Sequence, residues 1–450
     1  MTSQHSSHVI VIGGGFAGLS CAVALAGRGA RVTVLEARRT LGGRAGSFVD
    51  EATGEVIDNG QHLFMACYHE TRRFLETLGT GRHVRYQKRL MVDYIRRGFR
   101  ARLKCPPLPA PWHLLSGILT MKGLRHADRL SLMRAAPALK RLAASPEQVA
   151  ALEGISVTAW LDHLEQTENL RRWLWHPLAI ATLNQSPESA PASLLAAVLV
   201  AGFMSHAADS GLGVATVGLG DLYTGASRGY LEERGGIVRA GVPVIGLEVA
   251  GGRVTAALTR DGEHLEADAF VSALPPAALS RLGIPGLASE PLDTFASSPI
   301  LSVNLWFDRP VSAIADFDFA GLVDARVQWL FNKERILNGR ATHLAAVISA
   351  AGDLMTLGNE ELTALVEEDV RAALPAAAGA KVTRSMVVRE RAATFAATVA
   401  TEPLRPGHLT PYANFLLAGD WTERGMPATI ETAVRTGHRC AELLMATQHQ

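Results

Sequence analysis

The chain has 450 residues, of which 48% are hydrophobic and 19% charged, and its formal net charge is +1. This composition is typical of a globular protein with a large core, and it gives no electrostatic reason to expect a nucleic acid as partner. The four cysteines show no C-x-x-C spacing, so we expect neither a metal site nor a disulfide framework, and a reducing cytoplasm fits best.

Two features bear on where the protein resides. Residues 1–8 lack the basic stretch that begins a signal peptide, and the apolar run that follows them is short. No stretch holds the roughly 18 uninterrupted apolar residues of a membrane-spanning helix, and the nearest, residues 190–204, contains Pro191. We therefore expect a cytoplasmic protein, soluble or bound peripherally to the cytoplasmic face of a membrane.

The first elements form a β-turn-α-β unit. Residues 8–12 and 31–35 are short β-branched runs, and residues 16–28 between them have helical composition. The turn VIVIGGGFAGLS fits G-x-G-x-x-G at positions 13, 15 and 18. In such a unit the first glycine permits a tight turn, the second lets the backbone approach a pyrophosphate, and the third lets the helix pack on the strand.

An acidic residue and a second glycine turn extend this motif. Glu36 ends the second strand, where a carboxylate can accept hydrogen bonds from a ribose diol. The alternative is a glycine-rich turn with an incidental glutamate. Gly42 and Gly43 then precede Arg44, whose guanidinium would suit the long pyrophosphate and ribityl path of a flavin adenine dinucleotide (FAD), unless Arg44 is an ordinary exposed loop residue.

The rest of the chain alternates helical and β-rich stretches. We interpret residues 71–199 as a separate, mostly helical insertion. Later elements are short β runs with Gly-Gly turns at 229–275, β-like runs at 299–350, an amphipathic helix at 360–374, a strand at 415–418 and a helix from about Thr429. The chain has no internal repeat, so a single compact unit is expected.

Residues 102–144 combine a proline-bracketed Trp-Leu-Leu run with many basic residues and one acid, Asp128. Such a segment could contact a membrane surface and admit a lipid substrate. The alternative is a solvated helical hairpin.

Three motifs carry a resemblance to a known family. They are E-A-R-x-x-x-G-G-R at 36–44, IDNGQHLF at 57–64 and AGDWTERGMPATIETA at 418–433. Together with the first glycine turn, they resemble the flavin-dependent amine oxidase and phytoene desaturase superfamily. Within it, the second and third motifs are most similar to the hydroxysqualene dehydroxylases of bacterial hopanoid biosynthesis.

The resemblance implies an α/β fold: a Rossmann-like FAD-binding domain with an interleaved α+β substrate-binding domain. The first would comprise residues 1–64, 205–276 and 391–450, and the second residues 65–204 and 277–390. Because the TERGMPATI turn has no cysteine, non-covalent FAD is expected.

The same resemblance assigns residues to the cofactor. The pyrophosphate would lie at Gly13, Gly15, Phe16, Ala17 and Gly18, the adenosine ribose at Glu36 and the adenine at Val244. Ala37, Arg38, Gly43 and Arg44 would lie along the cofactor, and Gly60, Gln61 and His62 would approach the isoalloxazine. Gly419 and Asp420 would bind the ribityl or pyrophosphate region, and Ala428, Thr429 and Ile430 the pyrimidine edge, where a helix N-terminus stabilises negative charge.

The implied activity is reductive removal of the allylic hydroxyl of hydroxysqualene, a long-chain isoprenoid. The hydroxyl leaves only after protonation, and hydride comes from reduced flavin, so the protein must provide a dry apolar tunnel and an acid. The apolar part of the insertion up to residue 204 is a candidate wall, although plain core is the alternative. Electrons would come from an external reductant such as NADPH.

His62 is the candidate closest to this chemistry, although a lone histidine is more often a structural hydrogen-bonding group. His176 and Asp209 are weaker candidates, because no motif surrounds them. Two enzymatic alternatives are a phytoene-type desaturase and an amine oxidase, and the low aromatic content, 6%, counts mildly against the second. A non-catalytic isoprenoid-binding flavoprotein is the alternative from another class.

Overall fold

One parallel sheet is assembled from segments far apart in the sequence. The computed structural model describes residues 7–287, 292–311, 314–337 and 340–447. The sheet has the order β10-β2-β1-β14-β20, with all neighbours parallel. Its strands are β1 (His8–Ile12), β2 (Arg31–Glu36), β10 (Ile237–Ala240), β14 (Ala269–Ser272) and β20 (Phe415–Leu417). The carboxyl ends of these strands therefore meet at one edge, where α/β folds bind their ligands.

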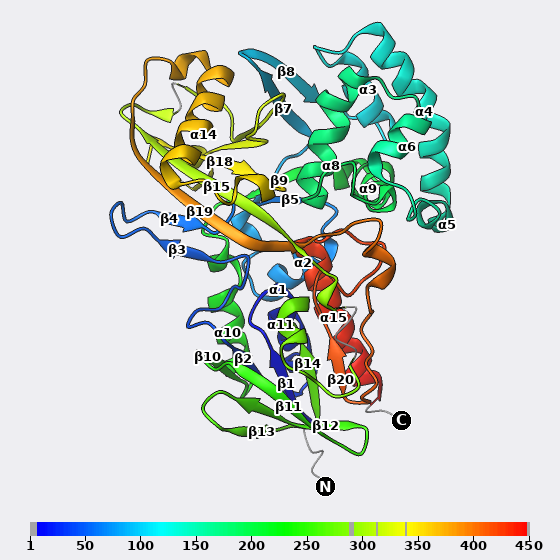
Figure 1. Cartoon of the computed structure of the whole chain (residues 1–450), viewed down its shortest axis with the longest axis vertical. Helices are drawn as coiled ribbons and strands as arrows, with labels where there is room; N and C mark the ends of the chain where they lie inside the picture. The colour runs from blue at the N-terminus through cyan, green and yellow to red at the C-terminus, as the bar shows by residue number, and fades with distance from the viewer. Residues whose placement is uncertain (1–6, 288–291, 312–313, 338–339, 448–450) are drawn as a thin grey trace.

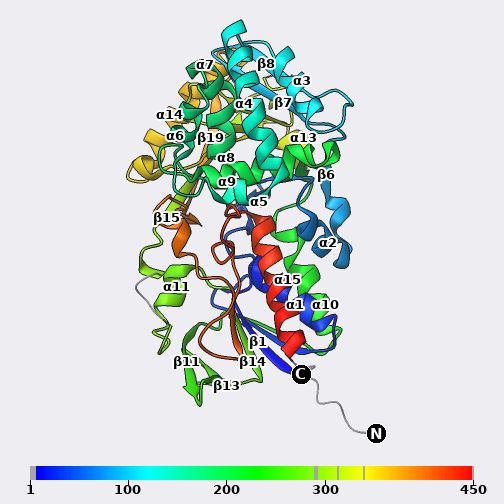
Figure 2. The same ribbon diagram turned by 90° about the vertical axis from the view of Figure 1, so that its right-hand side faces the viewer.

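Alternation along β1 explains how this sheet is covered on both faces. Val9 and Val11 pack with the helices α1 (Phe16–Ala26), α10 (Thr224–Glu232) and α15 (Ile430–Thr447). Ile10 and Ile12 face the opposite way, toward the antiparallel sheet of β11 (Val244–Ala250), β12 (Arg253–Thr259) and β13 (His264–Glu266). Figures 1 and 2 show this three-layer lobe, with both chain ends in it. Side chains that alternate faces and are apolar on both are typical of a covered parallel strand.

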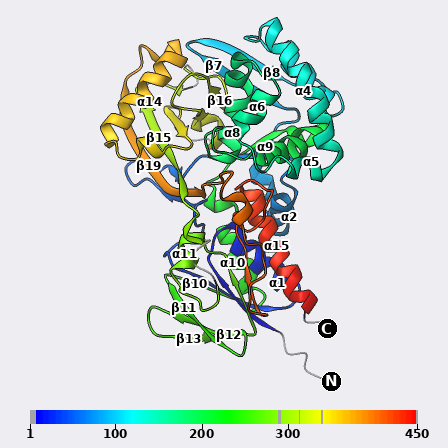
Figure 3. The same cartoon turned by 45° about the vertical axis from the view of Figure 1, so that its right-hand side comes forward.

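A seven-stranded mixed sheet forms the centre of the other lobe (Figures 1 and 3). Its order is β19-β15-β18-β17-β16-β7-β8, antiparallel except between β16 and β7. The strands are β7 (Met91–Arg96), β8 (Phe99–Lys104), β15 (Ser297–Phe307), β16 (Phe319–Leu322), β17 (Trp329–Asn332), β18 (His343–Ile348) and β19 (Val382–Phe395). The helix α14 (Asn359–Ala373) covers one face through Leu362, Val366 and Val370.

A group of helices packs toward the opposite face of this sheet. They are α3 (Trp112–Thr120), α4 (His126–Ala144), α5 (Pro146–Ala150), α6 (Val157–His163), α7 (Glu168–Leu170), α8 (His176–Leu183) and α9 (Ala192–Leu199), with π-helical turns at Arg171–Trp175 and Val200–Met204. They share one hydrophobic cluster with the sheet residues Trp329, Phe331 and Val347. The helix α2 (His69–Thr77) lies against α15 instead.

The prediction that residues 71–199 form a helical insertion was only partly right. The segment contains β6 (Val84–Tyr86), β7 and β8, and the last two continue the sheet of residues 297–395. The sequence of β8, FRARLK, alternates in burial as a half-buried strand does, but its charged residues obscured that pattern. The pairing of β7 with β16 is non-local and could not be read from either segment alone.

Small antiparallel elements connect the lobes. The strands β5 (Leu63–Met65) and β6 both pair with β9 (Leu212–Ala215), and β3 (Ser47–Val49) pairs with β4 (Val56–Asp58). The ribbon β3–β4 is tied to the large sheet by Glu55. The Glu55 carboxylate accepts hydrogen bonds from Trp306 Nε1 at 2.6 Å and from the Arg340 amide at 2.9 Å.

Glu55 predicts a pH-dependent contribution to stability. Burial alone would raise its pKa, but hydrogen bonds from His343, the Arg340 amide and Trp306 lower the pKa to about 2, from an ordinary value of 4.5. A carboxyl group whose pKa is lower in the folded protein than in the unfolded chain stabilises the fold fully at a pH above its unfolded pKa. This stabilisation is lost as the pH falls through the folded pKa. We expect Glu55→Gln to reduce the free energy of unfolding at pH 7 by about 1–2 kcal/mol, after allowance for solvent screening.

Urea denaturation of both proteins between pH 7 and pH 3 measures this effect. The difference should shrink as the pH falls below about 4.5. The matched control is Glu51→Gln, an exposed carboxylate on the same ribbon, which should change little at any pH. A difference that stays constant with pH would show that the charge of Glu55 contributes nothing.

Candidate active site

A large cavity of about 1160 Å³ lies between the lobes. Apart from Gly18 and Val244, every residue assigned above to the cofactor lines it. Those lining residues are Gly13, Gly15, Phe16, Ala17, Glu36, Ala37, Arg38, Gly43, Arg44, Gly60, Gln61, His62, Gly419, Asp420, Ala428, Thr429 and Ile430. The structure therefore brings both ends of the chain and the 57–64 motif around one space.

The two glycine turns form an open cradle at one end of this cavity. They are joined by a hydrogen bond of 2.9 Å from the Gly42 amide to the Gly14 carbonyl. A Cβ atom added to Gly15 would lie 4.0 Å from the Gly42 oxygen and from the Gly43 Cα, so no side chain fills the space before it. Gly18 lies outside the cavity, and a Cβ there would come within 1.9 Å of the Gly13 oxygen. Gly18 thus allows the helix α1 to pack on β1.

Glu36 shapes the cradle as well as lining the cavity. Its carboxylate is 8% exposed and accepts 2.8 Å hydrogen bonds from the amides of Gly14 and Arg38. Val244 begins β11 close by, since the Val242 amide donates to the Glu36 carbonyl at 2.9 Å, but Val244 itself does not line the cavity.

An ion pair joins the second glycine turn to the C-terminal motif. Arg44 donates to both carboxylate oxygens of Asp420, at 2.8 and 3.0 Å, and also to the Ala393 carbonyl at 3.2 Å. Two residues that the sequence assigned separately to the cofactor therefore hold each other. Such fork-shaped pairing fixes both side chains in one orientation.

A buried ion pair supports the C-terminal motif from behind. Glu402 and Arg405 are 3.0 Å apart, and both side chains are fully buried. Arg405 also donates to the carbonyls of Asp420, Trp421 and Met426, while Glu402 accepts from the Gly425 amide. Sequence reasoning missed both residues, because they precede the motif and carry no signature of their own.

The motif then enters α15, whose first turn faces the cavity. Ala428, Thr429 and Ile430 line the cavity where this helix begins, so the positive end of its dipole lies there. Glu431 points away and accepts hydrogen bonds from the Glu70 amide and from Thr71, which begin α2. The start of α15 is thereby fixed to a second helix.

His62 follows Gly60 and Gln61 in the loop before β5. Its Nδ1 lies 2.7 Å from the Gly60 carbonyl, which can only accept, so Nδ1 carries the proton. Burial lowers the pKa of His62, against the opposing effects of the Gly60 hydrogen bond and Asp58. A neutral ring with a protonated Nδ1 leaves Nε2 as a hydrogen-bond acceptor, so His62 at rest is not a proton donor.

Lys333 holds this loop from beneath. Its ammonium contacts the Gln61 side-chain oxygen and lies 3.5 Å from the Asp58 carboxylate, and its side chain is 3% exposed. Burial lowers the pKa of Lys333, although Asp58 acts in the opposite direction. A lone lysine after an apolar strand gives no sequence signal, and Lys333 was not predicted.

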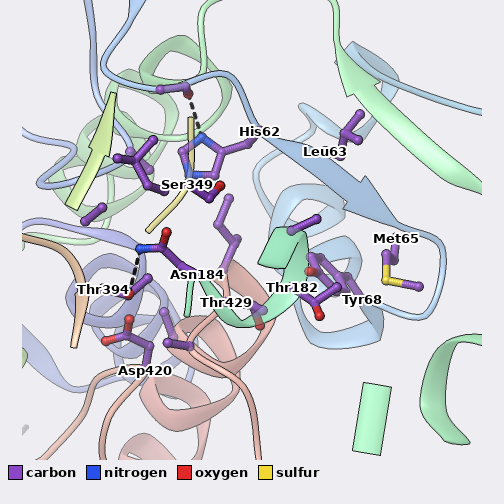
Figure 4. A pocket seen from close by; sticks show the side chains of 18 of the residues that line it. His62, Leu63, Met65, Tyr68, Thr182, Asn184, Ser349, Thr394, Asp420 and Thr429 are labelled. Atoms are coloured by element: carbon purple, nitrogen blue, oxygen red, sulfur yellow. Dashed lines mark hydrogen bonds between the residues drawn. The ribbon is translucent and has the colours of Figure 1, made fainter. Parts of the chain in front are cut away.

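The part of the cavity beyond the cradle is apolar, and we call it the apolar arm. It is lined by α3, α4 and α8 and by one face of the large sheet, including Leu115, Ile118, Leu132, Leu139, Leu174, Leu178, Trp329, Phe331 and Val347. We call the part of the cavity lined by His62, Asn184 and Ser349, which are labelled in Figure 4, the junction of the cradle and the apolar arm. His176 and Asp209 do not line the cavity, and Asp209 lies 3.4 Å from His69.

The cavity suits a bound dinucleotide. The cradle offers free backbone space beside the N-terminus of α1, Glu36 offers carboxylate oxygens, and a second helix N-terminus lies at the 428–430 turn. Sequence reasoning missed Ala273, which follows β14 and lies against Gly13, and Tyr223, whose hydroxyl donates to the Gly42 carbonyl at 2.8 Å.

The described residues contain neither a cluster of metal ligands nor a membrane-spanning helix. No group of three or more His, Cys, Asp or Glu side chains in them is arranged to hold a metal ion. Among the same residues, no helix is long and apolar enough to cross a membrane.

Comparisons with known proteins agree with this geometry. A family model described as flavin containing amine oxidoreductase matches residues 16–445. The chain is 32% identical to a hydroxysqualene dehydroxylase from Rhodopseudomonas palustris, covering 98% of this chain and 99% of the relative. It is 30% identical to the one from Sinorhizobium fredii, with 98% of each covered. A zeta-carotene desaturase from Zea mays is 26% identical, covering 96% of this chain and 82% of the relative.

Solved structures share the fold. Putrescine oxidase bound to putrescine aligns with a TM-score of 0.74 at 18% identity, covering 98% of this chain and 99% of that one. Cyclohexylamine oxidase from Brevibacterium oxydans aligns with a TM-score of 0.73 at 18% identity, covering 99% and 100%. The predicted α/β fold class is confirmed.

The cradle gives a prediction that separates cofactor binding from folding. Alanine is compatible with the Gly15 backbone, where φ is −89°, and its methyl group would meet no atom closer than 4.0 Å. We expect Gly15→Ala to leave the free energy of unfolding of the cofactor-free protein within about 0.5 kcal/mol. Because the methyl group fills the space before Gly15, bound FAD should fall more than about tenfold.

Absorbance of the purified protein and titration with FAD measure this loss. The matched control is Gly225→Ala in α10, where an added Cβ meets nothing within 4 Å. The control should bind FAD normally and gain about 0.5–1 kcal/mol of stability, since alanine favours a helix. Unchanged FAD binding by Gly15→Ala would contradict the placement of the pyrophosphate.

Proposed function

The chain belongs to the flavin-containing amine oxidoreductase family, and on that premise we propose that it is a hydroxysqualene dehydroxylase, which replaces the hydroxyl of hydroxysqualene by hydrogen to give squalene. The broader class is not in question: the protein is an FAD-dependent oxidoreductase. The observation that carries the proposal is the cavity, in which a cofactor cradle continues directly into a long apolar arm. Full-length relatives named for the same reaction support it.

We propose that the cofactor occupies the cradle as the motifs indicate. The pyrophosphate would lie before Gly13 and Gly15, the ribose at Glu36, and the ring system between His62 and the 428–430 turn. Residues 1–64, 205–276 and 391–450 would make the FAD-binding part, and residues 65–204 and 277–390 the substrate-binding part. When bound and reduced, by an external reductant such as NADPH, the flavin supplies the hydride that replaces the hydroxyl.

The chain's own residues have three tasks in this reaction. The apolar arm excludes water, so that the carbon left by the departing hydroxyl is not captured again by water. Its shape holds the isoprenoid chain, and polar side chains at the junction hold the hydroxyl. His62 lies there as a neutral acceptor, so in this proposal it orients the hydroxyl group.

Product analysis tests the function. Pre-reduced protein, kept without oxygen, is given hydroxysqualene, and we expect reoxidation of the flavin together with squalene. Phytoene and a simple amine are offered in parallel to the oxidised protein. Dehydrogenation of phytoene without squalene formation would favour the desaturase alternative, which the similarity to zeta-carotene desaturase supports. Oxidation of the amine alone would favour an amine oxidase. Either of these two results would contradict the proposal.

We also propose that residues 102–144 contact the membrane surface where the isoprenoid enters. Trp112 lines the cavity and is 60% exposed, and Leu130, on α4 of the same segment, is 62% exposed. Lys140, also on α4, lines the same cavity. An exposed aromatic and apolar surface with cationic neighbours suits an anionic lipid interface.

Flotation with anionic liposomes tests this contact. We expect Trp112→Glu to float several-fold less than the unmodified protein, because a charge replaces the inserting side chain. The matched control is Leu409→Glu, an equally drastic change at an exposed leucine outside the cavity. Equal behaviour of all three proteins would contradict the membrane contact.

A further inference from the structure

The apolar arm raises a problem of register. An isoprenoid chain repeats the same apolar unit, so sliding it by one unit leaves its contacts with an apolar wall nearly unchanged. Buried apolar area alone, being non-directional, cannot fix which carbon lies at the junction. A polar anchor at one point of the cavity would remove this ambiguity.

Most polar side chains at the junction already have partners. Among those labelled in Figure 4, Thr182 donates to the Leu178 carbonyl, Asn184 donates to Thr394, Asp420 pairs with Arg44, and Thr429 interacts with Thr432. Tyr68 interacts with Thr429. In the described part of the chain, Ser349 Oγ and His62 Nε2 have no hydrogen-bond partner, and both residues line the cavity.

Ser349 is held in a strained turn. It directly follows β18, and its amide donates to the Gln328 side chain at 2.7 Å. The next residue, Ala350, has φ of +50°, which non-glycine residues rarely adopt, and its amide donates to Asn184 Oδ1 at 2.7 Å. Backbone strain that neighbouring side chains enforce is often found at functional sites.

Asn184 is itself fixed from several directions. It ends α8 with φ of +48°, it is 5% exposed, and its amide group donates to the Ser298 carbonyl and to Thr394 Oγ1. Three separate elements thus converge on the turn that carries Ser349. None of these contacts uses the Ser349 hydroxyl.

Sheet register places β18, which leads into Ser349, beside the strand that adjoins the His62 loop. Val347 and Ser349 point to the same face, and Val347 is opposite Ser302 on β15. A Cβ added to Gly60 would lie 3.8 Å from Ser302 Oγ and 3.8 Å from His62 Cε1, so this part of the sheet adjoins the His62 loop. Both Ser349 and His62 line the cavity, and Figure 4 labels both side chains.

We propose that Ser349 and His62 together bind the hydroxyl group of the substrate and thereby set the register of its carbon chain. The Ser349 hydroxyl donates to the substrate oxygen, and the substrate hydroxyl donates to His62 Nε2. This inference rests on the proposed function and adds the residues that distinguish an allylic alcohol from the corresponding hydrocarbon. A site built to hydrogen-bond a hydroxyl discriminates strongly against an analogue that lacks it, because its polar groups are then left unpaired.

The test measures binding without turnover. Hydroxysqualene and squalene are titrated into the oxidised, FAD-loaded protein, and the perturbation of the flavin absorbance gives Kd for each. The unmodified protein should bind hydroxysqualene at least about tenfold more tightly than squalene. Ser349→Ala should weaken hydroxysqualene binding about 5- to 30-fold while leaving squalene binding within about twofold.

Two further variants make the result specific. Ser349→Thr keeps a hydroxyl at this position and should restore most of the preference for hydroxysqualene. Thr182→Val removes a hydroxyl that lines the same cavity but is already bonded within α8, so it should leave the preference unchanged. Melting temperatures of the FAD-loaded variants identify any that fold poorly. If Ser349→Ala is one of them, the ligand preference of Ser349→Thr tests the role of the hydroxyl instead.

The outcomes separate this inference from the function itself. If the protein forms squalene but Ser349→Ala keeps the full preference, or loses affinity equally for both ligands, the inference is overturned and the function stands. If the unmodified protein neither prefers hydroxysqualene nor forms squalene, both are overturned. Selective loss in Ser349→Ala with recovery in Ser349→Thr supports the hydroxyl-binding pair.

Discussion

The Arg44–Asp420 ion pair is the contact on which the candidate site depends. It joins the turn after β2 to the turn after β20, nearly the two ends of the chain, across one cavity. The Asp420 side chain is 6% exposed, so its charge needs a partner in place at all times. Arg44 supplies that partner and is therefore largely neutralised. If the cofactor binds as proposed, its negative charge would be met chiefly by backbone amides and by the N-termini of α1 and α15, both of which face the cavity.

The same pair explains why the C-terminal motif is supported so heavily. If the turn at 419–426 moved, Asp420 would leave Arg44 and bury an unpaired charge. Arg405 prevents this by donating to three carbonyls of the turn, and Glu402 neutralises Arg405 while holding the Gly425 amide. A fully buried ion pair is costly unless all its hydrogen bonds are made, and here the turn itself makes them. The hydrogen bonds that hold the turn at 419–426 in shape are therefore the same ones that satisfy the buried Glu402–Arg405 ion pair.

Local sequence was sufficient to predict three strands of the parallel sheet and the glycine turn that follows the first of them. The runs at 8–12 and 31–35 are β-branched, the run at 269–273 is apolar, and glycines at 13, 15 and 18 mark a tight turn between strand and helix. The pairing of β7 with β16 could not be predicted, because it depends on residues more than two hundred positions apart. Lys333, Arg405 and Ser349 were missed for a related reason. Each is a single residue without a motif, and only non-local sheet register or loop packing gives it a place near the cavity.

In the proposed function, two kinds of recognition would meet at the junction of the cavity. The cradle would recognise a dinucleotide through backbone geometry, which a short motif can encode and which is therefore visible in the sequence. The apolar arm would hold a carbon chain mainly through exclusion of water, and many sequences with the same apolar content would do this equally well. What distinguishes one isoprenoid reaction from another on this fold must then lie in the few polar atoms of the junction that have no internal partner. In this chain one such atom is the hydroxyl of Ser349, which lines the cavity just before Ala350, a residue held at φ of +50°.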